Sequence, residues 1–269
     1  MSLPPALADA LEFAGRLADA GRPAALERFR AAVSTHNKQA EGFDPVTQAD
    51  RDVEAAIRTL IAEHRPADGV IGEEGDEAPS RSGLTWVIDP IDGTRAFIAG
   101  LPTWTILIAL QDETGPIISV IDQPFTRERF LGAGRHGAWL DHGGARRRLS
   151  VRPGVAGLSD AIVSTTDPGL FEGPEAAAFS AIADAAKVRR FGLDAYAYAA
   201  LALGGVDLVI ESGLKAWDAA ALIPVVTGAG GVVSDWSGGP CHGGGQVVAA
   251  ADPVLHAAAL DRLAPAARR

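Results

Sequence analysis

Two aspartates that close an apolar segment are the residues best placed to do chemistry in this chain. The short run Trp-Val-Ile at 86–88 stops abruptly at Asp89-Pro90, and Asp92 follows three residues after Asp89. An apolar run that ends at Asp-Pro predicts a buried strand, because proline cannot donate to a strand ladder. We therefore expect Asp89 and Asp92 to lie at the end of a strand and not within it. Carboxylate oxygens in such a pair suit a divalent cation such as Mg²⁺.

The turn after these aspartates predicts an anion site. Gly93-Thr94 leaves the backbone exposed, and residues 95–99 have a composition that can open a helix. Free amides at a helix start bind anions, above all phosphate. Mg²⁺ shared between carboxylates and a substrate phosphate is therefore the chemistry that this stretch favours. The alternative is an ordinary loop, because Asp, Pro and Gly are the commonest turn formers.

Acidic residues follow apolar segments at two further places. Glu73 and Glu74 stand between glycines after the apolar run 69–71, and Asp218 heads an apolar helical stretch at 218–222. Each has a simpler explanation, because adjacent glutamates are commonly a surface charge pair and an aspartate commonly caps a helix. The occurrence of three acidic motifs in one chain favours a shared site.

The three motifs resemble the signatures of the inositol monophosphatase superfamily of Mg²⁺-dependent phosphatases. They are Gly-Glu-Glu at 72–74, Asp-Pro-Ile-Asp-Gly-Thr at 89–94, and Trp-Asp at 217–218 followed by an Ala-rich helix and Ala-Gly-Gly at 229–231. Their order and spacing match over nearly the whole chain. The resemblance implies an α/β fold, the layered α-β-α-β-α sandwich of that superfamily. It also implies a phosphomonoesterase that uses activated water, since the Asp-x-Asp-x-Thr/Val pattern of phosphatases with an aspartyl nucleophile ends no predicted strand here.

The resemblance implies the composition of the metal centre. Its ligands are oxygen donors only, and such a set suits two or three Mg²⁺ ions. Two ions about 3.5–4 Å apart activate a water on one side of phosphorus and stabilise the departing alkoxide on the other. The implied ligands are Glu73, Asp89, Asp92, Asp218 and the backbone carbonyl of Ile91.

Further residues are implied in catalysis and phosphate binding. Asp50, in a Val-Thr-x-x-Asp pattern, and Glu74 act as water-orienting groups, and the Thr94 hydroxyl holds the water. The amides of Gly93 and Thr94 hold phosphate oxygens. Asp50 has a second, compatible explanation, because Thr47 and Asp50 form a near capping box at the start of a helix.

The substrate contacts also follow from the resemblance. They are Arg95, Gly192, Leu193, Asp194 and Glu211. Simpler explanations stand beside two of them, because Glu211 ends a predicted strand and Asp194 can cap a helix.

One branch of the superfamily, the histidinol-phosphate phosphatases, is the most similar. The similar segments are 95–97, 196–198, 206–211 and 220–225, whereas Trp104 and Trp217 depart from that branch. The expected substrate is therefore L-histidinol phosphate, whose cationic end suits an acidic pocket. The alternatives are myo-inositol 1-phosphate, a broad range of small phosphate esters, or a noncatalytic regulator that binds Mg²⁺ or a phosphate ligand.

Composition limits the partners and the compartment. The chain has 269 residues with 34 acidic against 24 basic side chains, and its net charge of −10 argues against nucleic acid as a partner. The single cysteine, Cys241, excludes an internal disulfide and fits a reducing compartment. No apolar stretch reaches membrane-spanning length and the N-terminus does not read as a signal peptide, so we expect a cytoplasmic protein. A homodimer is implied by the resemblance alone.

The pattern of apolar runs predicts two halves, residues 1–154 with an antiparallel-rich sheet and residues 155–269 with an α/β pattern. The resemblance implies that the first half carries most metal ligands and that the two halves are packed as one catalytic unit. We expect helices at 7–29, bent or split at Gly21-Arg22-Pro23, and at 51–64, with a loop at 38–43 between them. Strands of the first half are expected at 70–71, 84–88, 103–111, 116–123, 130–133, 137–140 and 148–151. In the second half we expect strands at 161–164, 187–191, 208–212, 231–235 and 246–250, and helices at 174–185, 194–203, 218–229 and 253–263.

Overall fold

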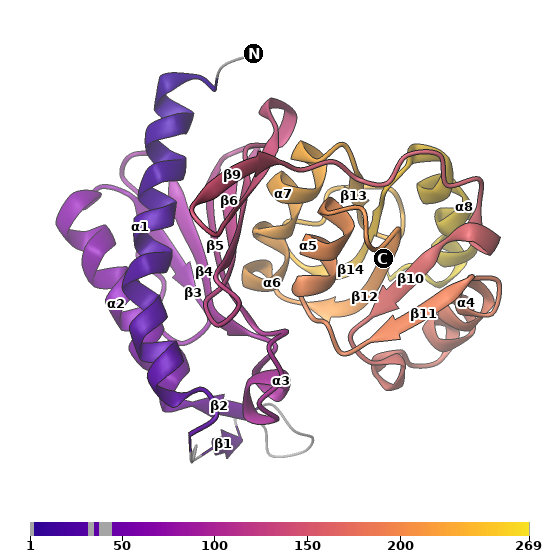
Figure 1. The fold of residues 1–269 in the computed structure, drawn as a ribbon, viewed down its shortest axis with the longest axis horizontal. Helices are drawn as coiled ribbons and strands as arrows, with labels where there is room; N and C mark the ends of the chain where they lie inside the picture. Colours follow the sequence, from indigo (N-terminus) through magenta and orange to yellow (C-terminus); the bar gives the residue numbers. More distant parts are fainter. Residues whose placement is uncertain (1–2, 32–34, 38–44, 269) are drawn as a thin grey trace.

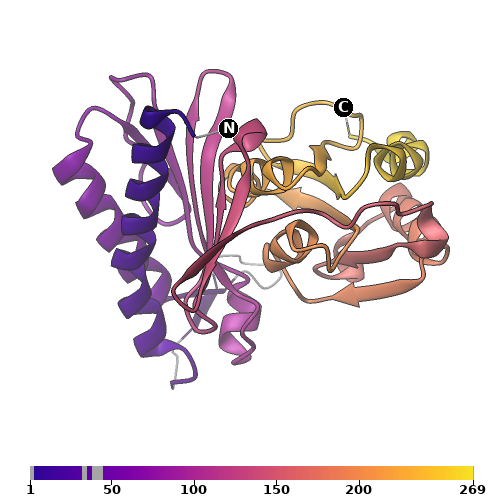
Figure 2. The same ribbon diagram turned by 45° about the horizontal axis from the view of Figure 1, so that its top comes forward.

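The computed structural model describes residues 3–31, 35–37 and 45–268. Its helices and sheets form five layers, which confirms the expected α-β-α-β-α sandwich (Figures 1 and 2). The first layer consists of helices α1 (Pro5–Arg28) and α2 (Gln48–His64). Three short helices lie between the two sheets, α5 (Tyr196–Ala202), α6 (Ala216–Ala220) and α7 (Leu222–Gly228). The last layer is α4 (Pro174–Ala183) and α8 (Pro253–Leu263).

The first sheet has seven strands in the chain order β3-β4-β5-β6-β7-β8-β9. Only the β3–β4 pair is parallel, and the other pairs are antiparallel. The strands are β3 (Gly69–Gly72), β4 (Thr85–Asp92), β5 (Thr105–Asp112), β6 (Gly115–Gln123), β7 (Glu128–Gly132), β8 (Ala138–His142) and β9 (Ala145–Arg148). A short separate pair, β1 (Thr35–Asn37) and β2 (Pro45–Thr47), precedes α2.

Alternating side chains of the first sheet enter two different cores. Trp86 and Ile88 of β4 pack with the α1–α2 layer, whereas Val87 between them packs with the middle helices. This is the period of two that a strand buried on both faces requires. Helix α7 comes especially close to the sheet at Gly132, where a Cβ atom would lie 2.3 Å from the Val225 amide nitrogen.

The second sheet has five strands in the order β11-β10-β12-β14-β13. The strands β11, β10 and β12 run parallel, and β14 pairs antiparallel with both β12 and β13. They are β10 (Ile162–Thr165), β11 (Val188–Phe191), β12 (Leu208–Leu214), β13 (Val232–Ser234) and β14 (Gly245–Ala250). Leu208 and Ile210 face the α4–α8 core and Val209 faces the middle helices, so this sheet is also covered on both sides.

Several expected elements differ from the structure. Helix α1 continues through Pro23 without a break, although a split was expected. The expected strand 148–151 lies earlier, at Ala145–Arg148. The expected helix 218–229 is two helices, α6 and α7, and Pro224 near the start of α7 explains the break because it cannot donate to the carbonyl of residue 220. The expected loop 38–43 lies outside the described residues.

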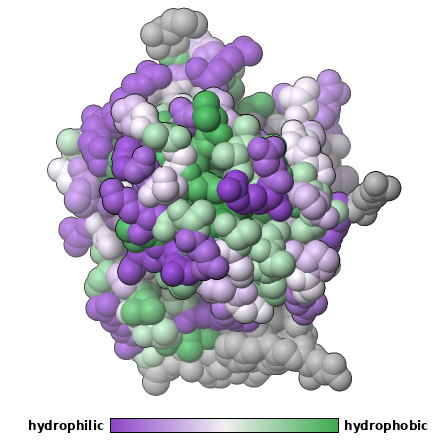
Figure 3. Space-filling model, turned by 90° about the vertical axis from the view of Figure 1, so that its right-hand side faces the viewer, coloured by the Kyte–Doolittle hydropathy of each residue, from purple (hydrophilic) through white to green (hydrophobic). Residues whose placement is uncertain are grey.

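The described helices include none that is long and apolar enough to cross a membrane. On the face shown in Figure 3, apolar side chains are mixed with hydrophilic ones. Cys241 is a buried free thiol, and burial raises its pKa to about 12. Its surroundings therefore favour a packed, neutral thiol.

Candidate active site

Strand β4 carries Asp89 and Asp92 into the site. The strand continues through both residues, and its pairing with β5 shifts register between them. Pro90 lies inside this irregularity, where the lack of a donor is tolerated. The expectation that both aspartates lie at the end of the strand and not within it holds for Asp92, the last residue of β4. It is wrong for Asp89, which lies inside the strand and pairs with Leu107.

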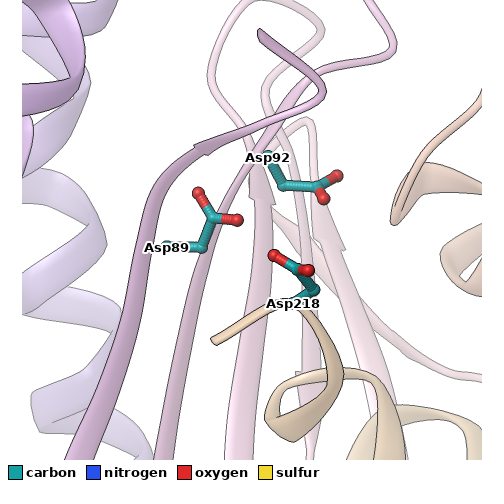
Figure 4. Close-up of side chains that lie close together, drawn as sticks. All are labelled: Asp89, Asp92 and Asp218. Atoms are coloured by element: carbon teal, nitrogen blue, oxygen red, sulfur yellow. The ribbon is translucent and has the colours of Figure 1, made fainter. Parts of the chain in front are cut away.

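Helix α6 brings a third carboxylate, Asp218, to the same place. Figure 4 shows the side chains of Asp89, Asp92 and Asp218 converging from β4 and α6. Each offers an oxygen, and these oxygens lie within 4.8 Å of one another. Asp218 is the third residue of α6, not its N-cap, and its Oδ2 accepts from the Lys215 amide at 2.6 Å.

Burial and mutual repulsion make this cluster unfavourable as three bare anions. Burial, then the charges of neighbouring acids, raise the pKa values of Asp89 and Asp92 well above the usual range. The pKa of Asp218 is raised to about 6, again mainly by burial. A divalent cation among hard oxygen donors would offset both effects, so the donor set fits Mg²⁺.

The start of α2 places Asp50 beside this cluster. The expected capping box is confirmed, because Asp50 Oδ2 accepts from the Thr47 amide at 2.8 Å and from its hydroxyl at 2.6 Å. Burial raises the pKa of Asp50 to about 6, and the charges of Glu73 and Glu74 add to the shift. Glu73 lines the pocket, whereas Asp50 and Glu74 are not among its lining residues.

The turn from β4 into the short helix α3 (Thr94–Ile98) has the conformation that a phosphate-binding turn needs. Gly93 adopts a left-handed φ of 77°, and a Cβ atom there would lie 3.0 Å from Asp194 Oδ2. Both features require glycine. The Thr94 hydroxyl donates to the Ile91 carbonyl at 3.1 Å. Gly93, Thr94, Ile91 and Arg95 all line the pocket.

The opposite wall comes from the second half of the chain. The segment before α5 reaches the cluster directly, because the Ala195 amide donates to Asp92 Oδ2 at 2.7 Å. Asp194 has a φ of 50° and a pKa raised to about 6 by burial, and it lines the pocket. Gly192 and Leu193 do not line it. Gly192 instead accepts from the Thr103 hydroxyl at 3.2 Å, which ties this segment to the first half.

Glu211 is the buried acid of this wall. Its Oε1 accepts from the Thr166 amide at 2.7 Å and from the Thr166 hydroxyl at 3.0 Å. Burial nevertheless raises its pKa to about 8. The expected strand end at Glu211 is wrong, because β12 continues to Leu214 through a second register shift.

The pocket between these walls encloses about 250 Å³. Sequence reasoning missed several of its lining residues, among them Thr166, Tyr198 and Ser212. Tyr198 is buried, and its hydroxyl finds no hydrogen-bond partner within the described part of the chain. Thr166 and Ser212 carry no pattern in the sequence, since their positions depend on how β10 and β12 pair.

Comparison with known proteins agrees with this geometry. The model of the inositol monophosphatase family matches residues 7–268. The histidinol-phosphatase of Mycobacterium tuberculosis is 40% identical over 229 residues, which are 81% of this chain and 84% of that protein. The chloroplastic bifunctional phosphatase IMPL2 of Arabidopsis thaliana is 39% identical over 258 residues, 92% of this chain and 72% of that protein.

A solved inositol monophosphatase from Zymomonas mobilis has the same fold. It superposes with a TM-score of 0.85 at 37% identity and covers 97% of this chain and 100% of its own. The sequence resemblance and the histidinol-phosphatase branch are thereby confirmed. The chain belongs to the inositol monophosphatase family and is a phosphoric monoester hydrolase.

Proposed function

We propose that this phosphatase hydrolyses L-histidinol phosphate to L-histidinol and phosphate, the reaction of histidine biosynthesis. The observation that carries the proposal is Glu211, a fully buried acid in the wall that faces the phosphate turn. Its raised pKa shows that its charged form is poorly stabilised by the protein alone. A cationic substrate group beside it would restore the carboxylate, whereas a neutral polyol would not. Relatives named histidinol-phosphatase support the same substrate.

The metal ligands that we propose are those predicted from the sequence. They are Glu73, Asp89, Asp92, Asp218 and the Ile91 carbonyl, which all line the pocket. When bound there, two or three Mg²⁺ ions would supply Lewis acidity toward the phosphate and a more acidic water. The chain's own part is to hold these oxygens together in spite of their repulsion.

Three residues are proposed to manage the attacking water. Asp50 uses Oδ2 for its cap, so its second oxygen is left to accept a proton from water. The Thr94 hydroxyl donates to Ile91, which leaves its lone pairs to accept from the same water. Glu74 stands beside Asp50 and adds negative charge that favours proton acceptance.

The remaining proposed contacts orient the substrate. The amides of Gly93 and Thr94 hold phosphate oxygens at the start of α3, and Arg95 extends from the same helix. Asp194 and Glu211 receive the cationic end. Gly192 and Leu193 do not line the pocket, and we propose that they act indirectly by holding the segment that carries Asp194.

A comparison of two substrates tests the proposal. We expect kcat/KM for L-histidinol phosphate to exceed that for myo-inositol 1-phosphate, because this ratio measures differential binding of the transition state. Glu211→Gln should weaken the reaction of the cationic substrate by about 1.5–3 kcal/mol, the scale of a charged hydrogen bond, and change the inositol ester much less. Equal losses of kcat/KM on both esters would contradict the proposal that Glu211 acts through its charge.

A parent enzyme that prefers myo-inositol 1-phosphate would overturn the substrate and leave the phosphatase chemistry intact. The inositol ester is the second candidate substrate because the Zymomonas mobilis relative is an inositol monophosphatase. Steady phosphate release that stops on chelation would in turn exclude the noncatalytic alternative.

We also propose a cytoplasmic homodimer in which residues 1–154 and 155–269 act as one catalytic unit. The contacts of Asp92 with Ala195 and of Thr103 with Gly192 support the single unit, because both join the two halves and the first lies in the pocket. Light scattering would measure the oligomeric state.

A further inference from the structure

Glu54 on α2 is buried and bound to the loop that carries Glu73 and Glu74. It lies one helical turn after Asp50, and 2% of its surface is exposed. Its Oε2 accepts from the Glu74 amide at 2.8 Å, and its Oε1 accepts from the Gly75 amide at 2.9 Å. One carboxylate thus fixes two successive amides of the acidic loop.

Arg58, a further turn along α2, holds the same loop through its carbonyls. Its Nε donates to Glu54 Oε1 at 2.6 Å, and its two terminal nitrogens donate to the carbonyls of Gly75 and Asp76 at 3.1 and 3.0 Å. We call this pair the Glu54–Arg58 clamp. It binds donors and acceptors of the loop together, so the loop has little freedom to move away from α2.

The glycines that flank the acidic pair are explained by the clamp. A Cβ atom at Gly72 would lie 2.3 Å from Glu54 Oε1, and one at Gly75 would lie 2.9 Å from the same oxygen. Neither position has room for a side chain beside the carboxylate. The Gly-Glu-Glu-Gly motif is therefore shaped by Glu54 as well as by the acids that it contains.

We propose that Glu54 is a positioning residue that sets the Mg²⁺ affinity of the site by holding Glu73 toward Asp89 and Asp218. The inference rests on the proposed function, in which Glu73 is a metal ligand. Carboxylates repel one another, so an unrestrained loop with two acids would move outward from this cluster. A carboxylate suits the clamp because it only accepts, whereas an amide side chain would present an N–H group to one of the loop amides.

Glu54→Gln tests the clamp through binding as well as turnover. Loss of a group that orients a metal ligand typically lowers affinity or activity about 10–100-fold, and we expect the Mg²⁺ dissociation constant from calorimetry to rise by such a factor. The Mg²⁺ concentration for half-maximal turnover should rise in parallel, while kcat at saturating Mg²⁺ changes little. Arg58→Lys keeps a positive charge near Glu54 but loses the planar fork, so its loss should be smaller.

Ile57→Val is the matched control. Ile57 lies on the same helix and is fully buried in the α1–α2 core. This variant should lower the unfolding temperature without changing Mg²⁺ affinity. Unchanged Mg²⁺ affinity in Glu54→Gln would overturn the proposal, and so would an equal loss in Ile57→Val. If the parent bound Mg²⁺ but hydrolysed no phosphate ester, the proposed function would fail while calorimetry still tested the clamp.

Discussion

At the scale of single residues, the site depends on carboxylates that are unfavourable together until a cation joins them. Asp218→Asn removes one charge and keeps the size of the side chain. We expect kcat/KM to fall by at least about 100-fold, since a direct ligand should matter more than the groups that support ligands. Removal of one repelling charge should leave the unfolding temperature of the chelated protein unchanged or higher.

Asp141→Asn provides the reference for this variant. Asp141 pairs with Arg146 on the far hairpin, and both side chains are partly exposed. Exposed pairs contribute about 0–1 kcal/mol, so neither activity nor stability should change much. Full activity in Asp218→Asn would contradict the proposal that Asp218 is a metal ligand.

The two tyrosines of the chain differ in one testable respect. Tyr196 donates its hydroxyl to Glu128 at 2.8 Å, whereas the buried Tyr198 hydroxyl has no partner among the described residues. Tyr196→Phe should cost about 1 kcal/mol of unfolding free energy, and Tyr198→Phe should cost nothing or stabilise the protein. Chemical denaturation of both variants measures the difference, and a larger loss in Tyr198→Phe would contradict it.

At the scale of elements, the turn between β4 and α3 concentrates the steric demands of the site. Gly93→Ala forces a left-handed conformation on a residue with a side chain and brings its Cβ against Asp194. We expect a loss of about 1–2 kcal/mol from the backbone alone, together with a strong loss of turnover.

Gly143→Ala separates these two effects. Gly143 has a φ of 62° but open space around its Cβ position. It should show a similar loss of unfolding free energy, measured by denaturation, and normal turnover. Equal turnover in both variants would mean that the turn does not shape the site.

Sequence reasoning predicted most elements because buried strands and helices have distinct periods. It failed where the chain departs from those periods for a reason that is not local. The strand β4 continues past Asp89-Pro90 because β5 still pairs with Asp92. Helix α1 continues through Pro23 because it is packed on α2 and the first sheet. Thr166 and Tyr198 were missed because only tertiary packing brings them to the pocket. Glu54 was missed because only the packing of α2 brings it to the amides of Glu74 and Gly75.

The motifs around the acids were predicted well for a different reason. Turn and cap residues act over three or four positions, so a short window of sequence contains their whole geometry. Thr47 with Asp50, and Gly93 with Thr94, show this directly. The opposite wall, with Glu211 and Asp194, depends on which strands become neighbours and was therefore known only from resemblance.

At the scale of the whole molecule, stability should respond to pH through the pocket. The folded pKa of Glu211 is about 8, raised by burial from an ordinary value near 4.5. A raised acid pKa contributes stability that is fully present below about pH 4.5 and is lost as pH rises through about 8. The parent should therefore lose unfolding temperature relative to Glu211→Gln across this window. A difference that stayed constant from pH 4.5 to 8.5 would contradict the buried, protonated state.

The hydrogen bond from the Ala195 amide to Asp92 has a consequence for how such enzymes diversify. Asp194, which lines the pocket and is proposed to receive the cationic end of the substrate, directly precedes Ala195 in the chain. The Ala195 amide in turn donates to Asp92, a proposed metal ligand. A substitution that retunes substrate preference at this segment therefore also perturbs the machinery common to all substrates. Changes at Glu211 escape this constraint, because its partners Thr165 and Thr166 belong to the second sheet and the loop after it. New substrate specificities should therefore arise more readily through substitutions in β12 than through substitutions in the segment that precedes α5.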